Sequence, residues 1–351
     1  MKDVRIVTYC TWTSLGSIMQ TVGLKKALSE LGAHSSLWLH ENNDRYRVSR
    51  IRSIKSLLRI IYEIMITSKR KSAYRKRVSF IRANIDVEPY ADYDELVDKA
   101  ATDKADLFLA GSDQIWNPDL CNPVFFLDLP VTKKRVSYAA SMGKTVINPD
   151  KRETFEKLLH NFDTVSVREQ ECADIISSMV DREVEVHIDP TFLVSADDWR
   201  QYEVPYGIRG PYILLYMLYW NDSCKEKINR LQRESGLPVY AIADGLTGVY
   251  VYNVLHDVGP GEFLWLIDHA SYVVTSSFHG VAFSTILNKK FAAVVNPSAT
   301  SRIANLMRIL SVPQVVIEDL ADAPDFDYAT INEAIQREKE KSMQYLKKVL
   351  E

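Results

Sequence analysis

Short apolar runs alternate with stretches of helical periodicity along most of this chain, and no other feature restricts its fold as strongly. Val4–Cys10 and Leu107–Ala110 have the length and composition of strands, whereas Ser17–Leu31 repeats its apolar residues at helical spacing and ends at Gly32. Strands that alternate with helices are typical of α/β proteins with parallel sheets. The sequence therefore predicts the α/β fold class.

The alternation occurs in two sets of similar length, separated by a segment of turn residues. Ser195–Gly210 holds one proline and two glycines and is the expected linker. We predict two facing Rossmann-like domains, over residues 1–195 and 196–351, with a helix at Tyr328–Leu350 assigned to the second. In such pairs, ligands bind in the cleft near the carboxyl ends of the strands.

Composition excludes several classes of protein. With 46% hydrophobic and 25% charged residues among 351, the chain has enough apolar material for two cores and is not disordered. Its longest wholly apolar run, Tyr212–Trp220, is far shorter than the roughly 20 residues that span a bilayer, so we expect no transmembrane helix. The N-terminus has no signal-peptide pattern, and the four cysteines form no CxxC pair. We expect a cytoplasmic protein without a metal site.

Basic residues concentrate in one segment of an otherwise acidic chain. Between Arg45 and Arg82 there are 13 lysines or arginines and one acidic residue, while the whole chain has a net charge of −3. Apolar residues recur at helical spacing from Ile51 to Met65, so residues 45–82 resemble a basic amphipathic insertion. This insertion could lie on an anionic membrane surface, hold an acceptor diphosphate, or pack on the N-terminal domain with solvated charges. A nucleic-acid partner is not expected, because few aromatics are interleaved.

One group of candidate site residues follows the predicted strand Ala270–Val274. Thr275, Ser276, Ser277, His279 and Gly280 lie between the end of a strand and the start of a helix. Amides at a helix N-terminus bind anions, hydroxyls add donors, and histidine can act as a general acid near neutrality. The alternative is that the hydroxyls cap the helix and the histidine only packs nearby.

A second group follows the strand that ends at Ala110. Asp113 could act as a base on a hydroxyl, and the neighbouring aromatic and amide side chains suit sugar binding by stacking and hydrogen bonds. The acceptor-binding candidates here are Gly111, Ser112, Gln114, Trp116 and Asn117. The alternative is a Gly-Ser-Asp turn that caps the following segment.

Other candidates are scattered along the chain. Arg168 follows the strand Val165–Val167, and Arg302 follows a later one, so either guanidinium could hold a phosphate or carboxylate. An ion pair of Arg168 with nearby acids, including Glu169 and Asp189, is the alternative. Gly16 and Gln20 lie near the first strand-to-helix turn, and we add them to the acceptor candidates, although this turn lacks the dinucleotide fingerprint.

These motifs together resemble the polysaccharide pyruvyl transferase family. The matching pieces occur in the family's order from residue 8 to about residue 310: TSLGSIMQTVGLKKALSELG, AGSDQIWN, RVSYAASMG, VSVREQECADII, DPTFLVSADDW, YILLYML, GPGEFLWLIDHASYVVTSSFHGVAFSTILNKKFAAV and SRIANLM. The resemblance implies a GT-B-like pair of Rossmann-like domains. It also implies transfer of pyruvate from phosphoenolpyruvate, as a co-substrate, to a sugar of a surface polysaccharide or its lipid-linked precursor. The product would be a pyruvate ketal.

The resemblance also implies roles for single residues. The arginine of the family's SVRE-like stretch falls on Arg168, a contact to phosphoenolpyruvate, and the family's histidine falls on His279, the general acid. Many members have an arginine where this chain has Ser277, so the chain follows an SFHG variant and we choose Arg302 as the replacing cation. Asp113 is our choice of base, and no metal is required.

Two other functions fit the same features. A GT-B glycosyltransferase that uses a nucleotide sugar would share both the architecture and the class of acceptor. A non-catalytic protein of polysaccharide assembly that only binds the acceptor is the other alternative, because the arginine is missing at Ser277.

Overall fold

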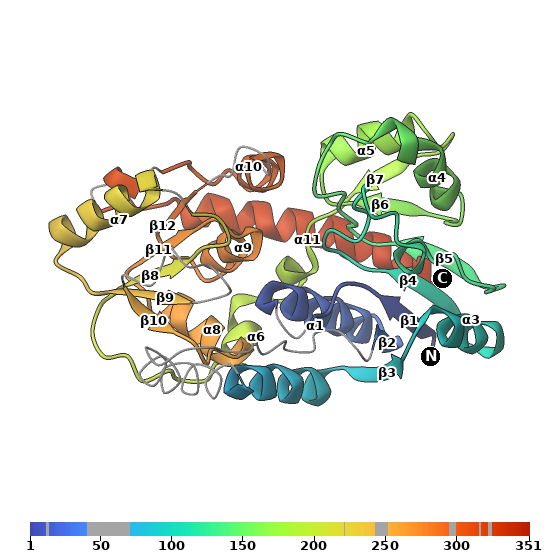
Figure 1. Cartoon of the computed structure of the whole chain (residues 1–351), viewed down its shortest axis with the longest axis horizontal. Coiled ribbons are helices and arrows are strands. Elements are labelled where there is room, and N and C mark those ends of the chain that lie inside the picture. Colours follow the sequence, from blue (N-terminus) through green and yellow to red (C-terminus); the bar gives the residue numbers. More distant parts are fainter. Residues whose placement is uncertain are drawn as a thin grey trace, which may run out of the picture.

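The computed structural model describes residues 1–11, 14–40, 71–220, 222–242, 252–294, 300–315, 317–321 and 325–351. Two parallel sheets of five strands dominate it, one in each half of the chain (Figure 1). This confirms the predicted α/β class. Among the described residues, no helix is both long and apolar enough to cross a membrane.

The first sheet has the order β3-β2-β1-β4-β5, so the first strand of the chain lies at its centre. All four pairings are parallel. Its strands are β1 (Asp3–Val7), β2 (His34–His40), β3 (Asp86–Tyr90), β4 (Leu107–Ala110) and β5 (Lys134–Ser137). A further parallel pair, β6 (Val165–Val167) and β7 (Val184–Val186), continues from β5 through single bridges.

The second sheet repeats this order as β10-β9-β8-β11-β12, again all parallel. Its strands are β8 (Ile213–Tyr216), β9 (Val239–Ile242), β10 (Asn253–Leu255), β11 (Tyr272–Thr275) and β12 (Phe291–Ala293). In both sheets the order reverses beside the central strand. The carboxyl ends of the strands at such a reversal form the usual ligand crevice of doubly wound folds.

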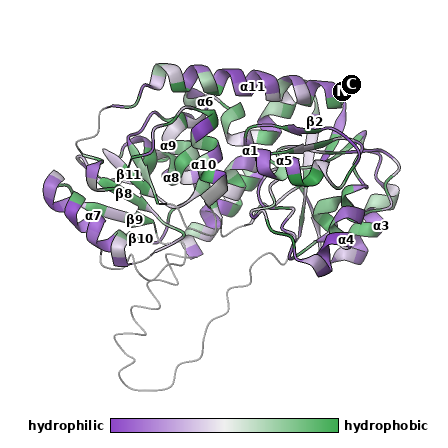
Figure 2. Cartoon of the chain, turned by 90° about the horizontal axis from the view of Figure 1, so that it is seen from above, coloured by the Kyte–Doolittle hydropathy of each residue, from purple (hydrophilic) through white to green (hydrophobic). Residues whose placement is uncertain are grey.

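Helices cover the sheets and connect their strands. They are α1 (Leu15–Glu30), α3 (Tyr93–Thr102), α4 (Pro149–Leu159), α5 (Gln170–Ser177), α6 (Ala196–Arg200), α7 (Asp222–Ser235), α8 (Pro260–Asp268), α9 (Phe278–Ile286), α10 (Thr300–Ile309) and α11 (Tyr328–Leu350). Residues 71–84 form another helix, and short 3-10 turns occur at η1 (Pro123–Phe126), η2 (Pro190–Leu193) and η4 (Ile317–Asp319). Figure 2 shows hydrophilic residues along the outward helices α7 and α11 and hydrophobic residues in the inner strands.

Helix α11 joins the two halves. It begins beside the second sheet and runs back over the first, so that its end lies near the N-terminus (Figure 1). Tyr345 donates a hydrogen bond to the carbonyl of Ser137 at 2.8 Å, and Lys134 donates to the carbonyl of Val349 at 3.0 Å. The helix that was assigned from sequence to residues 196–351 therefore packs its last turns on the N-terminal half.

The described part of the basic segment also contacts the other half. Lys76 forms an ion pair with Glu262 at 2.6 Å and donates to the carbonyl of Asp257 at 2.8 Å. Arg77 is buried and donates to the carbonyl of Val258. Lys76 and Arg77 therefore bind the C-terminal half and are not available for contact with a membrane. Arg45 and the apolar stretch Ile51–Met65 lie outside the described residues.

Candidate functional site

The centre of the site is a buried ion pair between the ends of two strands. Arg168 follows β6 and donates from Nη1 to Asp189 Oδ2 at 2.7 Å and from Nε to Glu169 Oε1 at 3.0 Å. Its guanidinium also lies 4.0 Å from the centre of the Phe278 ring. Burial opposes the charge of Arg168, but the carboxylates of Glu169 and Asp189 outweigh this effect and raise its pKa. Its Nη2 is buried without a hydrogen-bond partner, so one donor of a fixed cation is left for a ligand.

Asp189 organises this centre. It caps η2, and its Oδ1 accepts from the Thr191 backbone and hydroxyl at 3.0 and 2.9 Å. Its Oδ2 accepts from Ser112 at 3.0 Å as well as from Arg168, and it is completely buried. Burial alone would raise the pKa of Asp189, but His279 and Arg168 lower it, so the carboxylate is charged.

His279 lies in the first turn of α9, beside this pair. Its Nε2 is 3.8 Å from Asp189 Oδ2 and is buried without a hydrogen-bond partner. Burial lowers the pKa of His279, the carboxylates of Asp189 and Asp113 raise it, and Arg168 and Arg302 lower it. The net direction is downward, so burial and the two arginines outweigh the two carboxylates.

Gly16 fixes the position of His279 from the other half of the chain. A Cβ atom at residue 16 would lie 2.1 Å from His279 Nδ1 and 2.4 Å from its Cγ. The imidazole therefore packs directly on the backbone of α1. We predicted Gly16 to be an acceptor contact, but in the structure its missing side chain leaves room for the His279 ring.

Arg302 enters the same region from α10. With the Gln114 amide turned so that its oxygen faces Arg302, that oxygen accepts from Nη1 at 2.6 Å and from Nη2 at 3.2 Å. The Nε of Arg302 is buried without a partner. Arg302 and Arg168 line the same pocket, and burial and the like charge of Arg168 lower the pKa of Arg302.

A pocket opens beside these groups. It encloses about 720 Å³ of empty volume, part of it open to solvent, and is lined by Arg168, His187, Asp189, Phe278, Arg302, Asn305, Arg308 and Lys341, among others. The lining comes from both halves of the chain and includes four basic side chains and three acidic ones, of which Glu169 and Asp189 are paired with Arg168. Such a pocket suits a small anion with more than one charge.

Asp113 and its neighbours line a second pocket, on the side of α1. This pocket of about 540 Å³ is lined by Tyr9, Thr11, Ser14, Ser17, Asp113, Gln114, Asn117 and Leu120. Asp113 has φ 73, a left-handed conformation that costs a non-glycine residue free energy. Its carbonyl accepts hydrogen bonds from Ile115 and Ser141, which holds this turn in place. Gln114 of this pocket contacts Arg302 of the first pocket, so the walls of the two pockets touch.

The hydroxyls before α9 make internal contacts. Thr275 donates to the Tyr216 carbonyl at 2.6 Å, and Ser276 accepts from the amides of Leu218 and Tyr219 at 2.8 and 2.9 Å. Ser277 is buried and makes no side-chain cap on α9. A Cβ at Gly280 would lie 2.1 Å from Thr275 Oγ1. The side chains of Thr275 and Ser276 therefore hold the end of β11 against the end of β8 and the segment after it, and Gly280 allows α9 to approach Thr275 closely.

Two predicted acceptor residues are part of the core. Trp116 is completely buried, donates from its indole nitrogen to the Phe125 carbonyl at 3.0 Å and stacks on Phe126. It offers no face to a sugar, which corrects the expectation of a stacking platform. Gln20 is completely buried as well, and its amide nitrogen donates to the carbonyls of Tyr9 and Ser17.

Gly111 and Ser112 support the turn from behind. A Cβ at Gly111 would lie 2.9 Å from the Thr8 Cβ, and Thr8 donates to the Ser112 carbonyl at 2.7 Å. Ser112 is completely buried and reaches Asp189. Both residues position Asp113 and Asp189, and they are not exposed in either pocket.

Sequence reasoning treated Asp189 only as a structural partner of Arg168. The ion pair that was the alternative role of Arg168 does exist, and it coexists with an unpartnered donor. A signal was present, because Asp-Pro directly after a short strand places a carboxylate at a carboxyl end and starts a turn. Tyr9, which lines the second pocket, was also missed.

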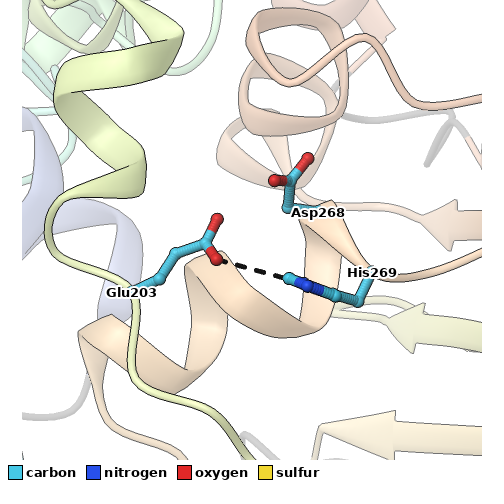
Figure 3. A group of neighbouring side chains, drawn as sticks. All are labelled: Glu203, Asp268 and His269. Atoms are coloured by element: carbon cyan, nitrogen blue, oxygen red, sulfur yellow. Dashed lines mark ion pairs between the residues drawn. The ribbon is translucent and has the colours of Figure 1, made fainter.

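Among the described residues, one group of side chains could hold a metal ion. Glu203, Asp268 and His269 bring ligand atoms within 4.8 Å of one another (Figure 3). However, Arg200 Nε already pairs with Asp268 Oδ2 at 2.9 Å. Burial and the negative charge of Asp268 raise the pKa of Glu203 to about 7. The two carboxyl groups are therefore compensated by a proton and an arginine, and the group does not resemble a cation site.

Solved structures with a similar fold include a forosaminyltransferase, UGT89C1 and a UDP-GlcNAc 2-epimerase. Spinosyn forosaminyltransferase SpnP is 16% identical, with a TM-score of 0.52 over 99% of this chain and 98% of that one. UGT89C1 of Arabidopsis thaliana, solved with quercetin, is 11% identical, with a TM-score of 0.52 over 99% of each chain. UDP-GlcNAc 2-epimerase from Methanocaldococcus jannaschii is 11% identical, with a TM-score of 0.51 over 96% and 92%. At these identities the likeness concerns the fold alone, and it confirms the GT-B-like arrangement.

Sequence comparison is more specific. No curated protein matches the chain significantly. The family model described as polysaccharide pyruvyl transferase matches residues 15–298, which include Arg168, Asp189 and His279. The chain therefore belongs to the polysaccharide pyruvyl transferase family.

Proposed function

We propose that this protein transfers the pyruvyl group of phosphoenolpyruvate to two hydroxyls of one sugar, in a surface polysaccharide or its lipid-linked precursor. The observation that carries the proposal is a pair of arginines, Arg168 buried and Arg302 partly buried, each with a buried, unpartnered N–H, beside a histidine held against Asp189. Family membership supports the same reaction.

The donor needs cations, because phosphoenolpyruvate carries a phosphate and a carboxylate. Arg168 Nη2 and Arg302 Nε supply unpartnered donors, and the pocket adds Arg308 and Lys341 at its wall. Charge-assisted hydrogen bonds to such anions are about twice as strong as neutral ones. We call the pocket lined by Arg168, His187 and Arg302 the donor pocket. Arg302 reaches it from α10 and takes the place of the arginine that is absent at Ser277.

The reaction then needs one acid and one base. His279, protonated, gives its proton to the methylene carbon of phosphoenolpyruvate, and the resulting cationic centre is captured by a sugar hydroxyl whose proton passes to Asp113. The C–O bond to phosphate breaks, a second hydroxyl of the sugar attacks the same carbon, and its proton leaves with the phosphate. The proton on Asp113 then returns to His279 through solvent. The products are a pyruvate ketal and inorganic phosphate, so atoms and protons balance.

A donor with several negative charges would itself raise the pKa of His279. In the ligand-free protein, burial and the two arginines lower that pKa. Negative charge bound to Arg168 and Arg302 offsets their effect and favours the imidazolium. Binding of the donor therefore prepares the acid that the reaction consumes.

The test is turnover with a defined donor. We expect the protein, incubated with phosphoenolpyruvate and a panel of nitrophenyl and lipid-linked glycosides, to release phosphate. One product should gain the mass of one pyruvic acid less one water. UDP-sugars replace phosphoenolpyruvate in a parallel series, and turnover with them alone would show a glycosyltransferase instead. Acceptor binding without turnover by either donor would show a non-catalytic protein.

A lipid-linked acceptor would place the protein at the inner face of the cell membrane. Lys71, Arg75 and Arg82 are exposed on the helix of residues 71–84, next to the undescribed part of the basic segment. We expect the protein to sediment with anionic vesicles at low salt, and a variant with Lys69, Arg70, Lys71 and Arg75 changed to Gln to stay in solution. Lys76 and Arg77 are left intact because they hold the C-terminal half. A wild type that does not sediment would remove the membrane contact.

A further inference from the structure

A third pocket opens at the carboxyl ends of β1, β2 and β3 in the first sheet. It encloses about 940 Å³, part of it open to solvent. Its described lining residues are Thr8, Tyr9, Trp38, Leu39, His40, Tyr90, Tyr93, Asn122, Pro123, Val124 and Phe125. Nothing in the proposed reaction uses this space, which is large enough for a small-molecule ligand.

The walls of this pocket are aromatic but not charged. Five of its described lining residues are Tyr, Trp or Phe, and none is Asp, Glu, Lys or Arg. The donor pocket, in contrast, is lined by four basic and three acidic side chains. Phosphoenolpyruvate or a diphosphate would leave its charge unpaired in the aromatic pocket, so its ligand is neutral.

The polar atoms of the walls suit a ligand with many hydroxyls. The His40 and Tyr90 rings meet edge to face with centroids 5.3 Å apart, and Tyr93 is 37% exposed at the rim. The indole nitrogen of Trp38 is buried without a hydrogen-bond partner. Aromatic faces with polar edges bind the apolar face and the hydroxyls of a sugar ring at the same time.

Tyr9 connects this pocket with the reaction centre. It lines both the aromatic pocket and the pocket of Asp113, and its ring lies 4.5 Å from that of Phe125, centroid to centroid. Tyr9 and Asp113 line the same pocket, and burial and the charge of Asp113 raise the pKa of Tyr9. A chain of sugars can thus run from Asp113 past Tyr9 into the aromatic pocket.

We propose that the aromatic pocket binds a second, uncharged sugar unit of the acceptor, next to the unit that receives the pyruvyl group. The pocket therefore selects an oligosaccharide over a single sugar. This assignment rests on the proposed function only in calling the ligand an acceptor, because binding of the disaccharide does not require the donor.

Equilibrium binding without donor tests the assignment. A panel of nitrophenyl mono- and disaccharides of glucose, galactose, mannose and their N-acetylamino forms is titrated into the full chain by calorimetry. We expect at least one disaccharide to bind about tenfold more tightly than its monosaccharide. Tyr93→Ala and His40→Ala should each cut that disaccharide affinity about two- to tenfold, the size of an aromatic contact, and leave monosaccharide affinity unchanged.

Tyr252→Ala is the matched control. Tyr252 is a half-buried tyrosine of the C-terminal half whose hydroxyl makes one hydrogen bond, to Asn229, as that of Tyr93 does to the Asp128 carbonyl. We expect this variant to bind both classes of sugar as the wild type does. Melting temperatures show that all three variants are folded.

Several outcomes would overturn the assignment. The assignment is wrong if disaccharides bind no better than monosaccharides, or if Tyr93→Ala and His40→Ala weaken the binding of both classes equally. It is also wrong if the ligand whose binding these variants weaken is UDP or an alkyl monoglycoside. Failure of the proposed function is separate. Disaccharide binding without turnover of phosphoenolpyruvate would support the sugar pocket and contradict the proposed reaction. Turnover on single sugars, with no gain from a second sugar unit, would support the reaction and contradict the sugar pocket.

Discussion

At the scale of the residue, the site depends on charges that are buried but not fully paired. Arg168 is 4% exposed and is held by two carboxylates, yet one of its nitrogens lacks a partner. A fixed cation of this kind is preorganised, so no side-chain ordering is required when an anion binds. His279 gains its position from Asp189 on one side and from the backbone of Gly16 on the other.

Replacement of His279 by Ala tests the general acid. We expect turnover to fall by about 10² to 10⁴, the usual contribution of general acid catalysis, while the protein stays folded. Turnover within a few-fold of wild type would remove His279 from this role.

The pH profile adds a second test of the same residue. Because the acid must be protonated and the pKa of His279 is lowered, kcat/KM should fall as the pH rises above a value below 6.5. Arg302→Gln removes a cation that lowers this pKa, so the fall should move to higher pH even though donor affinity drops. A profile that moves to lower pH, or stays in place, contradicts the assignment.

Gly16→Ala tests the contact beneath His279. In most helices this change is favourable by roughly 0.5–1 kcal/mol, but here the new Cβ would lie 2.1 Å from the imidazole. The ring must move, and we expect turnover to fall by about 10² because displacements near 1 Å have effects of this size. Gly236→Ala is the control. Gly236 has φ +67 and no neighbour within 4 Å of a Cβ, so we expect it to lower stability and to leave turnover unchanged.

At the scale of the element, short strands aim polar side chains into a shared crevice. Arg168 follows β6, Asp189 follows β7 and Asp113 follows β4, and all three reach the same region from neighbouring strand ends. Parallel strands make this possible, since their carboxyl ends meet at one edge. Helix α11 has a different task, because it covers His187, which also lines the donor pocket.

His187 makes the attachment of α11 sensitive to acid. Its ring packs against Tyr138 and Tyr345, and Ser342 of α11 lies 3.3 Å from its Nδ1. Burial and the charge of Lys341 lower the pKa of His187 to about 3. Below pH 6.5 His187 binds a proton in the unfolded chain but stays neutral in the folded one. The free energy of unfolding therefore falls progressively between about pH 6.5 and 3, by up to about 1.4 kcal/mol per pH unit.

The measurement is urea unfolding at several pH values. His187→Gln should be less stable at pH 7 but should lose less stability than wild type between pH 6 and 4. His160→Gln, at the exposed end of α4, is the control and should follow the wild type. An unchanged slope in His187→Gln would mean that another group carries the acid sensitivity.

At the scale of the whole molecule, the donor pocket is shared by the two halves. Arg168 and Asp189 come from the first half, and Phe278 and Arg302 from the second. Outside the pocket, the contacts of the last turns of α11 and those of Lys76 and Arg77 hold the halves together. A ligand in the pocket therefore stabilises the folded molecule as a unit.

Phosphoenolpyruvate should raise the melting temperature of the wild type. Binding at 100 times the dissociation constant stabilises the native state by about 2.7 kcal/mol. We expect this ligand-induced shift to be lost in Arg168→Ala and reduced in Arg302→Gln, and retained in Arg209→Ala, an exposed residue of the linker. No shift in the wild type would contradict the donor pocket itself.

The sequence alone determined the pattern of secondary structure. The strands Leu107–Ala110 and Val165–Val167 and the helix Tyr328–Leu350 have the predicted bounds, because apolar periodicity is a local property. Strand β3 was missed, since it is an edge strand that contains Pro89, and proline within a run argues against a strand. Strand β10, also an edge strand, is only three residues long.

Only the tertiary structure decided which of the predicted site residues are available to a ligand. More than a hundred residues separate Asp113 from His279 and Arg302 in the sequence. Even so, the charges of Asp113, Arg168 and Arg302 all act on His279. Trp116 carried the same sequence signal as Asn117, one position away, but it became core while Asn117 lines a pocket. The physical reason is that residue type sets what a side chain can do, whereas exposure depends on packing between segments distant in sequence. The local pattern does not contain that packing.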